Sequence, residues 1–126
     1  MEEAVESARG KGPIAAFYIE TPANPTNGMV DLEHARKIVS GLHGPDGKRS
    51  VIIVDNTLLG PIYQTPLADG ADLVVTSLTK YVGGHSDLIA GWMFGSGRYT
   101  RTDPRHAHDP GHDVRSAYRL VADAFT

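Results

Sequence analysis

Short, nearly continuous apolar runs alternate with polar and glycine- or proline-rich stretches between residues 14 and 94. Three of these runs, at residues 14–19, 51–54 and 73–75, have the length and composition of strands that are buried on both faces, as in a parallel sheet. A fourth run covers residues 88–94 and follows a Gly-Gly pair, which permits a tight reversal. The pattern therefore predicts three parallel strands and an antiparallel fourth strand.

The apolar positions between residues 32 and 42 recur at helical spacing instead. Asp31 stands directly before them and is predicted to be the N-cap, because its side chain can accept a hydrogen bond from the first backbone N–H groups of a helix. Residues 56–71 are interrupted by glycines and prolines, so we expect at most one or two short helical turns there, around residues 66–68. Strand, helix, strand, crossover and strand is the order of an α/β layer.

The two ends of the chain differ from this central part. Residues 1–12 are polar and are predicted to form a frayed start or a linker. Residues 98–113 are rich in Arg, His and Asp and have almost nothing apolar to bury. Apolar positions at helical spacing return only over residues 114–125. We therefore divide the chain into a folded part, residues 1–97, and a divergent or disordered tail, residues 98–126.

Composition narrows the class of protein. The chain has 126 residues, which suits one domain, and 40% of them are hydrophobic and 21% charged, as in an ordinary globular protein. A net charge of -3 gives no reason to expect nucleic acid or an anionic membrane as a partner. The acidic start is not typical of a secretory signal, and no apolar run approaches the roughly 20 residues that span a bilayer. The absence of cysteine excludes disulfides and thiolate metal sites. A cytoplasmic protein is expected.

Polar and charged side chains stand at the ends of two of the predicted strands. Asp55 ends the second run, and Lys80 follows the third, three residues after Ser77. Neighbouring parallel strands end at one edge of a sheet, where open α/β sheets bind ligands. A Schiff-base lysine and an aspartate that pairs with a pyridinium nitrogen are the groups that proteins supply to pyridoxal phosphate (PLP). An exposed lysine and a turn-capping aspartate are the ordinary alternatives, and spacing alone leaves both interpretations open.

Longer motifs surround these two residues. They read ETPANPT at residues 20–26, VDNT at 54–57 and GADLVVTSLTKYVGGHSD at 70–87. In this order and at this spacing, they resemble successive motifs of the Cys/Met-metabolism PLP enzymes, which include cystathionine γ-synthase, cystathionine γ- and β-lyases, methionine γ-lyase and O-acetylhomoserine sulfhydrylase. The resemblance covers residues 14 to about 96. It implies a three-layer α/β/α fold with a mainly parallel sheet, as a fragment of the large domain of a fold-type-I PLP-dependent transferase.

The resemblance also implies roles for individual residues. Lys80 would form the Schiff base with PLP and move protons between the α and γ positions of the substrate. Asp55 would pair with the pyridine nitrogen. The other expected positions are Ser77 and Thr79 at the phosphate, Asn24 near the phenolic oxygen, and Thr57 and Glu20 behind the residues that touch the cofactor. His85 is expected to stabilise the Gly-Gly-His turn rather than act as a base.

The reaction that the resemblance implies is γ-elimination on methionine or cystathionine, with γ-replacement, as in cystathionine γ-synthase or O-acetylhomoserine sulfhydrylase, as the alternative. Its substrate would be a small sulfur amino acid, and full-length relatives would assemble as dimers or tetramers. Family members are several hundred residues long, so this chain is expected to hold only the middle of the large domain, with a tail that is divergent or frameshifted. The alternative to an enzyme is therefore a truncated, catalytically inactive protein that still binds PLP and is prone to self-association.

A histidine-rich segment lies within the tail. His106, His108, His112, Asp109 and Asp113 supply enough nitrogen and oxygen atoms to bind zinc or nickel. No predicted helix or strand orients them, and a genuine metal centre needs ordered surroundings to hold its ligands. We therefore expect adventitious binding there and no metal site.

Overall fold

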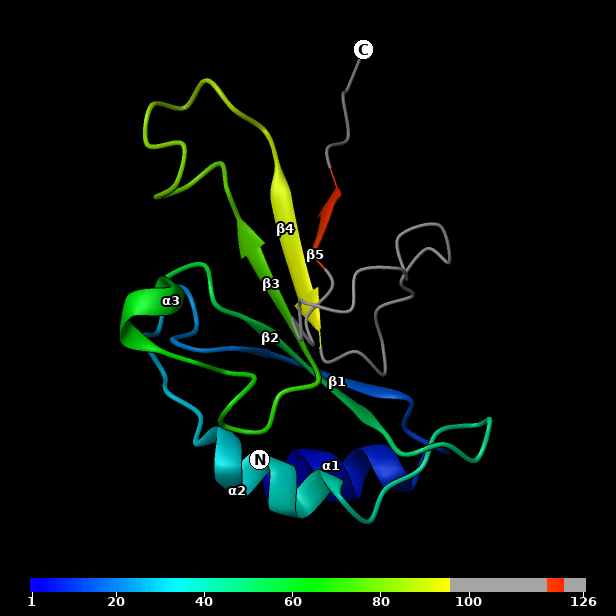
Figure 1. Ribbon diagram of the computed structural model, residues 1–126. Helices are drawn as coiled ribbons and strands as arrows, with labels where there is room; N and C mark the ends of the chain where they lie inside the picture. Colours follow the sequence, from blue (N-terminus) through cyan, green and yellow to red (C-terminus); the bar gives the residue numbers. More distant parts are fainter. Residues whose placement is uncertain (96–117, 122–126) are drawn as a thin grey trace, which may run out of the picture.

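A computed structural model of the chain describes residues 1–95 and the backbone of residues 118–121. Its centre is a five-stranded sheet in the order β1-β2-β3-β4-β5 (Figure 1). The strands are β1 (Ala16–Glu20), β2 (Val51–Asp55), β3 (Leu73–Ser77), β4 (Gly91–Gly95) and β5 (Tyr118–Val121). β1, β2 and β3 are parallel, whereas β4 is antiparallel to β3 and β5 is antiparallel to β4. The four predicted strands and the reversal before the fourth are confirmed.

The parallel strands end in polar residues. Glu20, Asp55 and Ser77 are the last residues of β1, β2 and β3. The register pairs Glu20 with Asp55, and Asp55 with Val75. Because successive side chains of a strand alternate between the two faces of a sheet, paired residues share a face. The side chains of Glu20, Asp55, Val75 and Ser77 therefore project from the same face, near one edge.

The opposite face of the sheet carries the hydrophobic core. Ile52 and Val54 of β2 are completely buried, and they pack in one cluster with Ile19 of β1 and Val74 of β3. Helix α2 (Leu32–Val39) covers this face with Leu32, Ala35 and Val39. Burying one apolar face of a sheet against an apolar helix stripe is the basic arrangement of an α/β layer, and the predicted α/β class is confirmed.

The N-terminus of α2 is capped as predicted. Asp31 has an extended backbone, and its Oδ1 accepts a hydrogen bond of 2.9 Å from the backbone N–H of His34. Exposed Glu33 in the first turn adds a negative charge where the helix dipole favours one. The cap therefore fixes the start of α2 directly before Leu32, the first of its core residues.

Replacing Asp31 with alanine is expected to lower the free energy of unfolding by about 1 kcal/mol, because one backbone N–H of the first turn loses its acceptor. Urea denaturation followed by circular dichroism measures the change. Asp31→Ser is the matched control, since a serine hydroxyl caps nearly as well. An equal loss in both variants would contradict the capping role.

The first residues of the chain are helical, so the prediction of a frayed start or linker is wrong. Helix α1 (Glu2–Arg9) begins with two acidic residues and ends with Arg9, a charge order that suits the helix dipole. Its Val5 is only 5% exposed, and Glu2 lies 3.3 Å from the ring of His34 on α2. The single buried valine and the contact with α2 give this helix its tertiary support, which a short polar stretch does not reveal in sequence.

Two other expectations are corrected or shifted. Residues 118–121 form β5 and pair with β4, so the helix predicted over residues 114–125 is wrong there. Pairing satisfies the backbone groups of β4, which would otherwise be an open edge. The short helical turn of the crossover is α3 (Gly60–Tyr63), a few residues earlier than expected.

No helix in the part of the chain that the structure describes has the length and apolar character needed to cross a membrane.

A buried carboxylate ties the crossovers to the sheet. Asp72, directly before β3, is 5% exposed and accepts hydrogen bonds of 2.6 Å from each of Arg36 and Arg49. Its Oδ2 also accepts the backbone N–H of Ile52 at 2.8 Å. One side chain thus joins the beginnings of β2 and β3 to α2.

Candidate functional site

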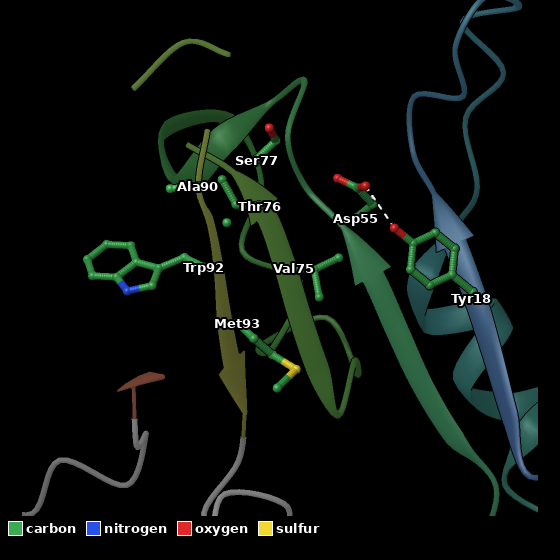
Figure 2. A pocket seen from close by; sticks show the side chains of 9 residues that line it. Tyr18, Asp55, Val75, Thr76, Ser77, Ala90, Trp92 and Met93 are labelled. Atoms are coloured by element: carbon green, nitrogen blue, oxygen red, sulfur yellow. Dashed lines mark hydrogen bonds between the residues drawn. The ribbon is translucent and has the colours of Figure 1, made fainter. Parts of the chain in front are cut away.

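A cavity of about 420 Å³ opens on the sheet face opposite α2. Figure 2 shows Asp55 of β2 and Tyr18 of β1 on one side of it, with Val75 of β3 and Met93 of β4 on the neighbouring strands. Its lining residues are Tyr18, Asp55, Val75, Thr76, Ser77, Ala90, Gly91, Trp92 and Met93. The cavity therefore combines an acidic group and a hydroxyl with an apolar floor, at the end of the sheet where β2 and β3 terminate.

The carboxylate of Asp55 is held by two neighbours. Its Oδ1 accepts the backbone N–H of Thr57 at 3.0 Å and the Thr57 hydroxyl at 2.6 Å. Its Oδ2 accepts the hydroxyl of Tyr18 at 2.8 Å, which is the dashed contact in Figure 2. A carboxylate that is bound through both oxygens has its plane fixed, which suits a group that must meet a ligand in one orientation.

Tyr18 is electrostatically coupled to this carboxylate. Burial, the hydrogen bond with Asp55 and the negative charges of Asp55 and Glu20 together raise the pKa of Tyr18 to about 12. The phenol remains neutral around pH 7, because its pKa lies far above that value. Tyr18 therefore acts as a hydrogen-bond donor toward Asp55 and not as a base.

Thr57 links the ends of β2 and β3. Its hydroxyl donates to Asp55 and accepts the backbone N–H of Ser77 at 2.9 Å. This bridge places the end of β3 beside Asp55, so that Asp55 and the hydroxyl-bearing residue Ser77 line the same cavity. The sequence prediction grouped these three residues, and the structure brings them together.

Lys80 and Thr79 lie in the turn that leaves β3. The backbone N–H of Lys80 is 3.4 Å from the carbonyl of Ser77, and the Lys80 carbonyl accepts the N–H of Gly84. Lys80 is exposed, and it lies outside the set of residues that line the cavity. The Thr79 hydroxyl is engaged with Ala90, donating to its carbonyl at 3.3 Å and accepting its N–H at 3.1 Å. Lys80 therefore lies on an exposed turn directly after β3, with its backbone next to that of Ser77.

The remaining predicted residues are more peripheral. Glu20 ends β1 opposite Asp55, and Asn24 follows in the loop after β1; both are exposed and neither lines the cavity. His85 lies 2.9 Å from the carbonyl of Gly83 through its Nδ1, which is the turn contact expected of it. Within the described residues, no group of three or more His, Asp or Glu side chains is placed to bind a metal, and residues 106–113 lie outside that part.

Tyr18 is the residue that sequence reasoning missed. It stands two positions before Glu20, so the alternation of a strand puts the two side chains on the same face of β1. β1 pairs directly with β2, and this face is therefore adjacent to Asp55. The two-residue periodicity was a usable signal, but an aromatic residue inside an apolar run is read first as a core residue.

Comparison with known proteins indicates the family to which the chain belongs. The chain matches the model of the family described as Cys/Met metabolism PLP-dependent enzyme over residues 2–118. It is 47% identical over 76 residues to the cystathionine gamma-synthase/O-acetylhomoserine (thiol)-lyase of Bacillus subtilis, a match that covers 60% of this chain and 19% of that protein. It is 46% identical over 74 residues to the cystathionine gamma-lyase of Homo sapiens, which covers 59% of this chain and 17% of the relative.

The fold has solved counterparts. The structure of apo CalE6, a methionine gamma lyase from Micromonospora echinospora, superposes with a TM-score of 0.59 at 32% identity, over 74% of this chain and 24% of that one. This likeness confirms the expected α/β fragment. The chain spans about a fifth of the length of the curated relatives it matches. A family match over residues 2–118 covers most of the sequence. The chain therefore belongs to the family of Cys/Met metabolism PLP-dependent enzymes.

Proposed function

We propose that this chain carries the cofactor-binding core of a PLP-dependent enzyme that acts on sulfur amino acids by γ-elimination. The single observation that supports it most strongly is the Asp55 carboxylate, fixed by Tyr18 and Thr57 at the edge of a cavity that Ser77 also lines. These residues belong to a chain that matches the family of Cys/Met metabolism PLP-dependent enzymes.

The residues around the cavity fit PLP chemically. A pyridinium nitrogen requires a carboxylate partner, which is Asp55. A flat aromatic ring requires an apolar surface, and Val75 and Met93 line the cavity beside Asp55. A phosphate requires hydroxyl or backbone N–H donors, and Ser77 offers its hydroxyl, whereas the Thr79 hydroxyl would have to give up its contact with the Ala90 carbonyl. Ser77 is therefore the stronger candidate for the phosphate.

Each protein group then has one task. Asp55 keeps the ring nitrogen protonated, and the bound cofactor supplies an electron sink for the negative charge that forms at the substrate's α carbon. Lys80 would provide the amine for covalent attachment and, once the amine of the substrate has displaced it, would carry protons between the α and γ positions of the substrate. Thr57 and Tyr18 keep Asp55 in place. Asn24 would lie near the phenolic oxygen of the cofactor, and Glu20 would lie behind the residues that touch it.

The choice of γ-elimination depends on the segment from Ser77 to His85, which resembles the lyases of the family most closely. Relatives named as a methionine gamma-lyase and as a cystathionine gamma-lyase support the same choice. A relative named as a cystathionine gamma-synthase keeps γ-replacement as the second candidate. The two reactions share every step up to loss of the γ-substituent, so the cofactor residues above serve both.

The decisive experiment concerns covalent attachment. We expect the full chain, incubated with PLP and reduced with borohydride, to carry the cofactor on Lys80, as located by peptide mass spectrometry. Lys80→Ala should lose this adduct, whereas Lys37→Ala, which removes an exposed lysine of α2, should keep it. Circular dichroism checks that both variants fold. An adduct of equal yield in the Lys80→Ala protein would refute the assignment.

Product analysis then separates the two reactions. Release of ammonia and an α-keto acid from methionine or cystathionine indicates γ-elimination. Formation of a new thioether from an activated homoserine ester and a thiol indicates γ-replacement. A chain that binds PLP at Lys80 but turns over neither substrate would be a cofactor-binding module that lacks the rest of the family's site, and the proposed γ-elimination would be rejected for it.

A further inference from the structure

The hydrogen bonds of Asp55 leave one defined position for a ligand. A carboxylate offers about four acceptor sites, two on each oxygen. Oδ1 uses both of its sites, for the N–H and the hydroxyl of Thr57. Oδ2 uses one, for the hydroxyl of Tyr18. Among the residues that the structure describes, the remaining acceptor site therefore belongs to Oδ2, on a carboxylate that lines the cavity.

We infer that Tyr18 is a positioning residue, whose hydroxyl and the two donors of Thr57 hold the Asp55 carboxylate so that the free acceptor site of Oδ2 receives the ring nitrogen of the cofactor. That the ligand is PLP rests on the proposed function. The arrangement of Tyr18, Asp55 and Thr57, here called the carboxylate clamp, belongs to the protein itself.

The location of Tyr18 argues against a role in the core. The buried face of the sheet is the one covered by α2, and Tyr18 projects from the other face with 62% of its surface exposed. Tyr18 reaches from β1 across to the end of β2, where its hydroxyl meets Asp55 (Figure 2). Little apolar area is buried by the ring, so its specific contribution is the hydroxyl. Tyr18→Phe removes that hydroxyl and leaves the ring in place.

The charges around Tyr18 make it a dependable donor. Two carboxylates act on it, Asp55 from β2 and Glu20 from its own strand. Burial, the hydrogen bond to Asp55 and these two charges all disfavour a negative phenolate and together raise the pKa of Tyr18 to about 12. Tyr18 therefore keeps its proton for Asp55 at neutral pH and well above it.

A double-mutant cycle tests the clamp in the full chain. The apparent dissociation constant for PLP is measured by absorbance titration for the wild type, Tyr18→Phe, Asp55→Asn and the double variant. We expect Tyr18→Phe to weaken binding by on the order of tenfold, the effect of losing one hydrogen bond to a charged group. In the Asp55→Asn background the same change should cost nothing further, since the two residues act as a unit. Tyr63→Phe, on the exposed helix α3, is the matched control without effect.

A cofactor-free measurement keeps the clamp and the proposed function separable. The pKa of Tyr18 is followed by NMR of ¹³C-labelled tyrosine, with Tyr18→Phe used to assign its signal. We expect a pKa near 12 in the wild type and a partial fall in Asp55→Asn, because the substitution removes the charge of Asp55 but leaves the burial of Tyr18 and the charge of Glu20. Failure of the wild type to bind PLP, with this fall observed, would reject the proposed function and the ligand while upholding the Tyr18–Asp55 contact. An unchanged Tyr18 pKa, or additive losses in the cycle, would overturn the positioning role.

Discussion

Replacing Asp72 with alanine is expected to lower the free energy of unfolding by about 3–5 kcal/mol, the usual cost of removing one partner from a buried ion pair. Asp72 is 5% exposed and accepts hydrogen bonds from Arg36, Arg49 and the backbone N–H of Ile52. Its loss leaves two partly buried guanidinium groups without their shared carboxylate. A domain of ordinary size is stable by only about 5–15 kcal/mol, so this variant should be close to unfolding at room temperature.

Urea denaturation of the full chain, followed by circular dichroism, measures the effect. Asp46→Ala is the matched control, because Asp46 pairs with Lys48 at 3.0 Å while both side chains are largely exposed. Its removal should leave stability nearly unchanged, as for most surface ion pairs. Asp72→Asn should fall between wild type and Asp72→Ala, since an amide keeps one acceptor. Equal denaturation midpoints for Asp72→Ala and Asp46→Ala would show that the buried network contributes little.

A second large effect is expected from two neighbouring isoleucines of β2. Ile52 is completely buried in the cluster under α2, and Ile52→Ala should cost about 2–5 kcal/mol through lost burial and the cavity it leaves. Ile53 projects from the other face, is only partly buried, and stays outside that cluster. Ile53→Ala should therefore cost clearly less, although the chemical change is identical.

The comparison of these two variants tests whether the second face of the sheet is open in solution. In the part of the chain that the structure describes, α2 lies on one face, and the cavity with Asp55 opens on the other. If Ile53→Ala proves as costly as Ile52→Ala, something covers that face in solution, and a second copy of the chain would be the first candidate. Denaturation midpoints measured at two protein concentrations would reveal such association.

The separation of faces explains how stability and the candidate chemistry coexist. Ile52 and Val54 serve the core, and Asp55, one residue further, projects from the opposite face. An alternating strand can thus hold a charged group at a cavity without burying it in the apolar cluster. The same reasoning applies to β3, where Val74 packs in the core and Ser77 lines the cavity.

Much of this molecule was already determined by its sequence. The continuous apolar runs predicted β1 to β3, the Gly-Gly reversal predicted an antiparallel β4, and the helical spacing after Asp31 predicted α2 with its cap. These signals are local, since they depend on alternation, helical period and capping within a few residues. The ordered motifs around Asp55 and Lys80 also sufficed to indicate the family, which the match over residues 2–118 established.

Tertiary structure alone decided the rest. Burial of Val5 and the contact between Glu2 and His34 support α1, and pairing with the edge of β4 makes residues 118–121 a strand despite their helical spacing. The contact between Tyr18 and Asp55 joins residues 37 positions apart. Such features depend on which surfaces pack together in the folded chain, and short-range sequence patterns do not contain that information. The sequence therefore determined the elements and the chemistry available, and only the packed sheet decided which side chains share a site.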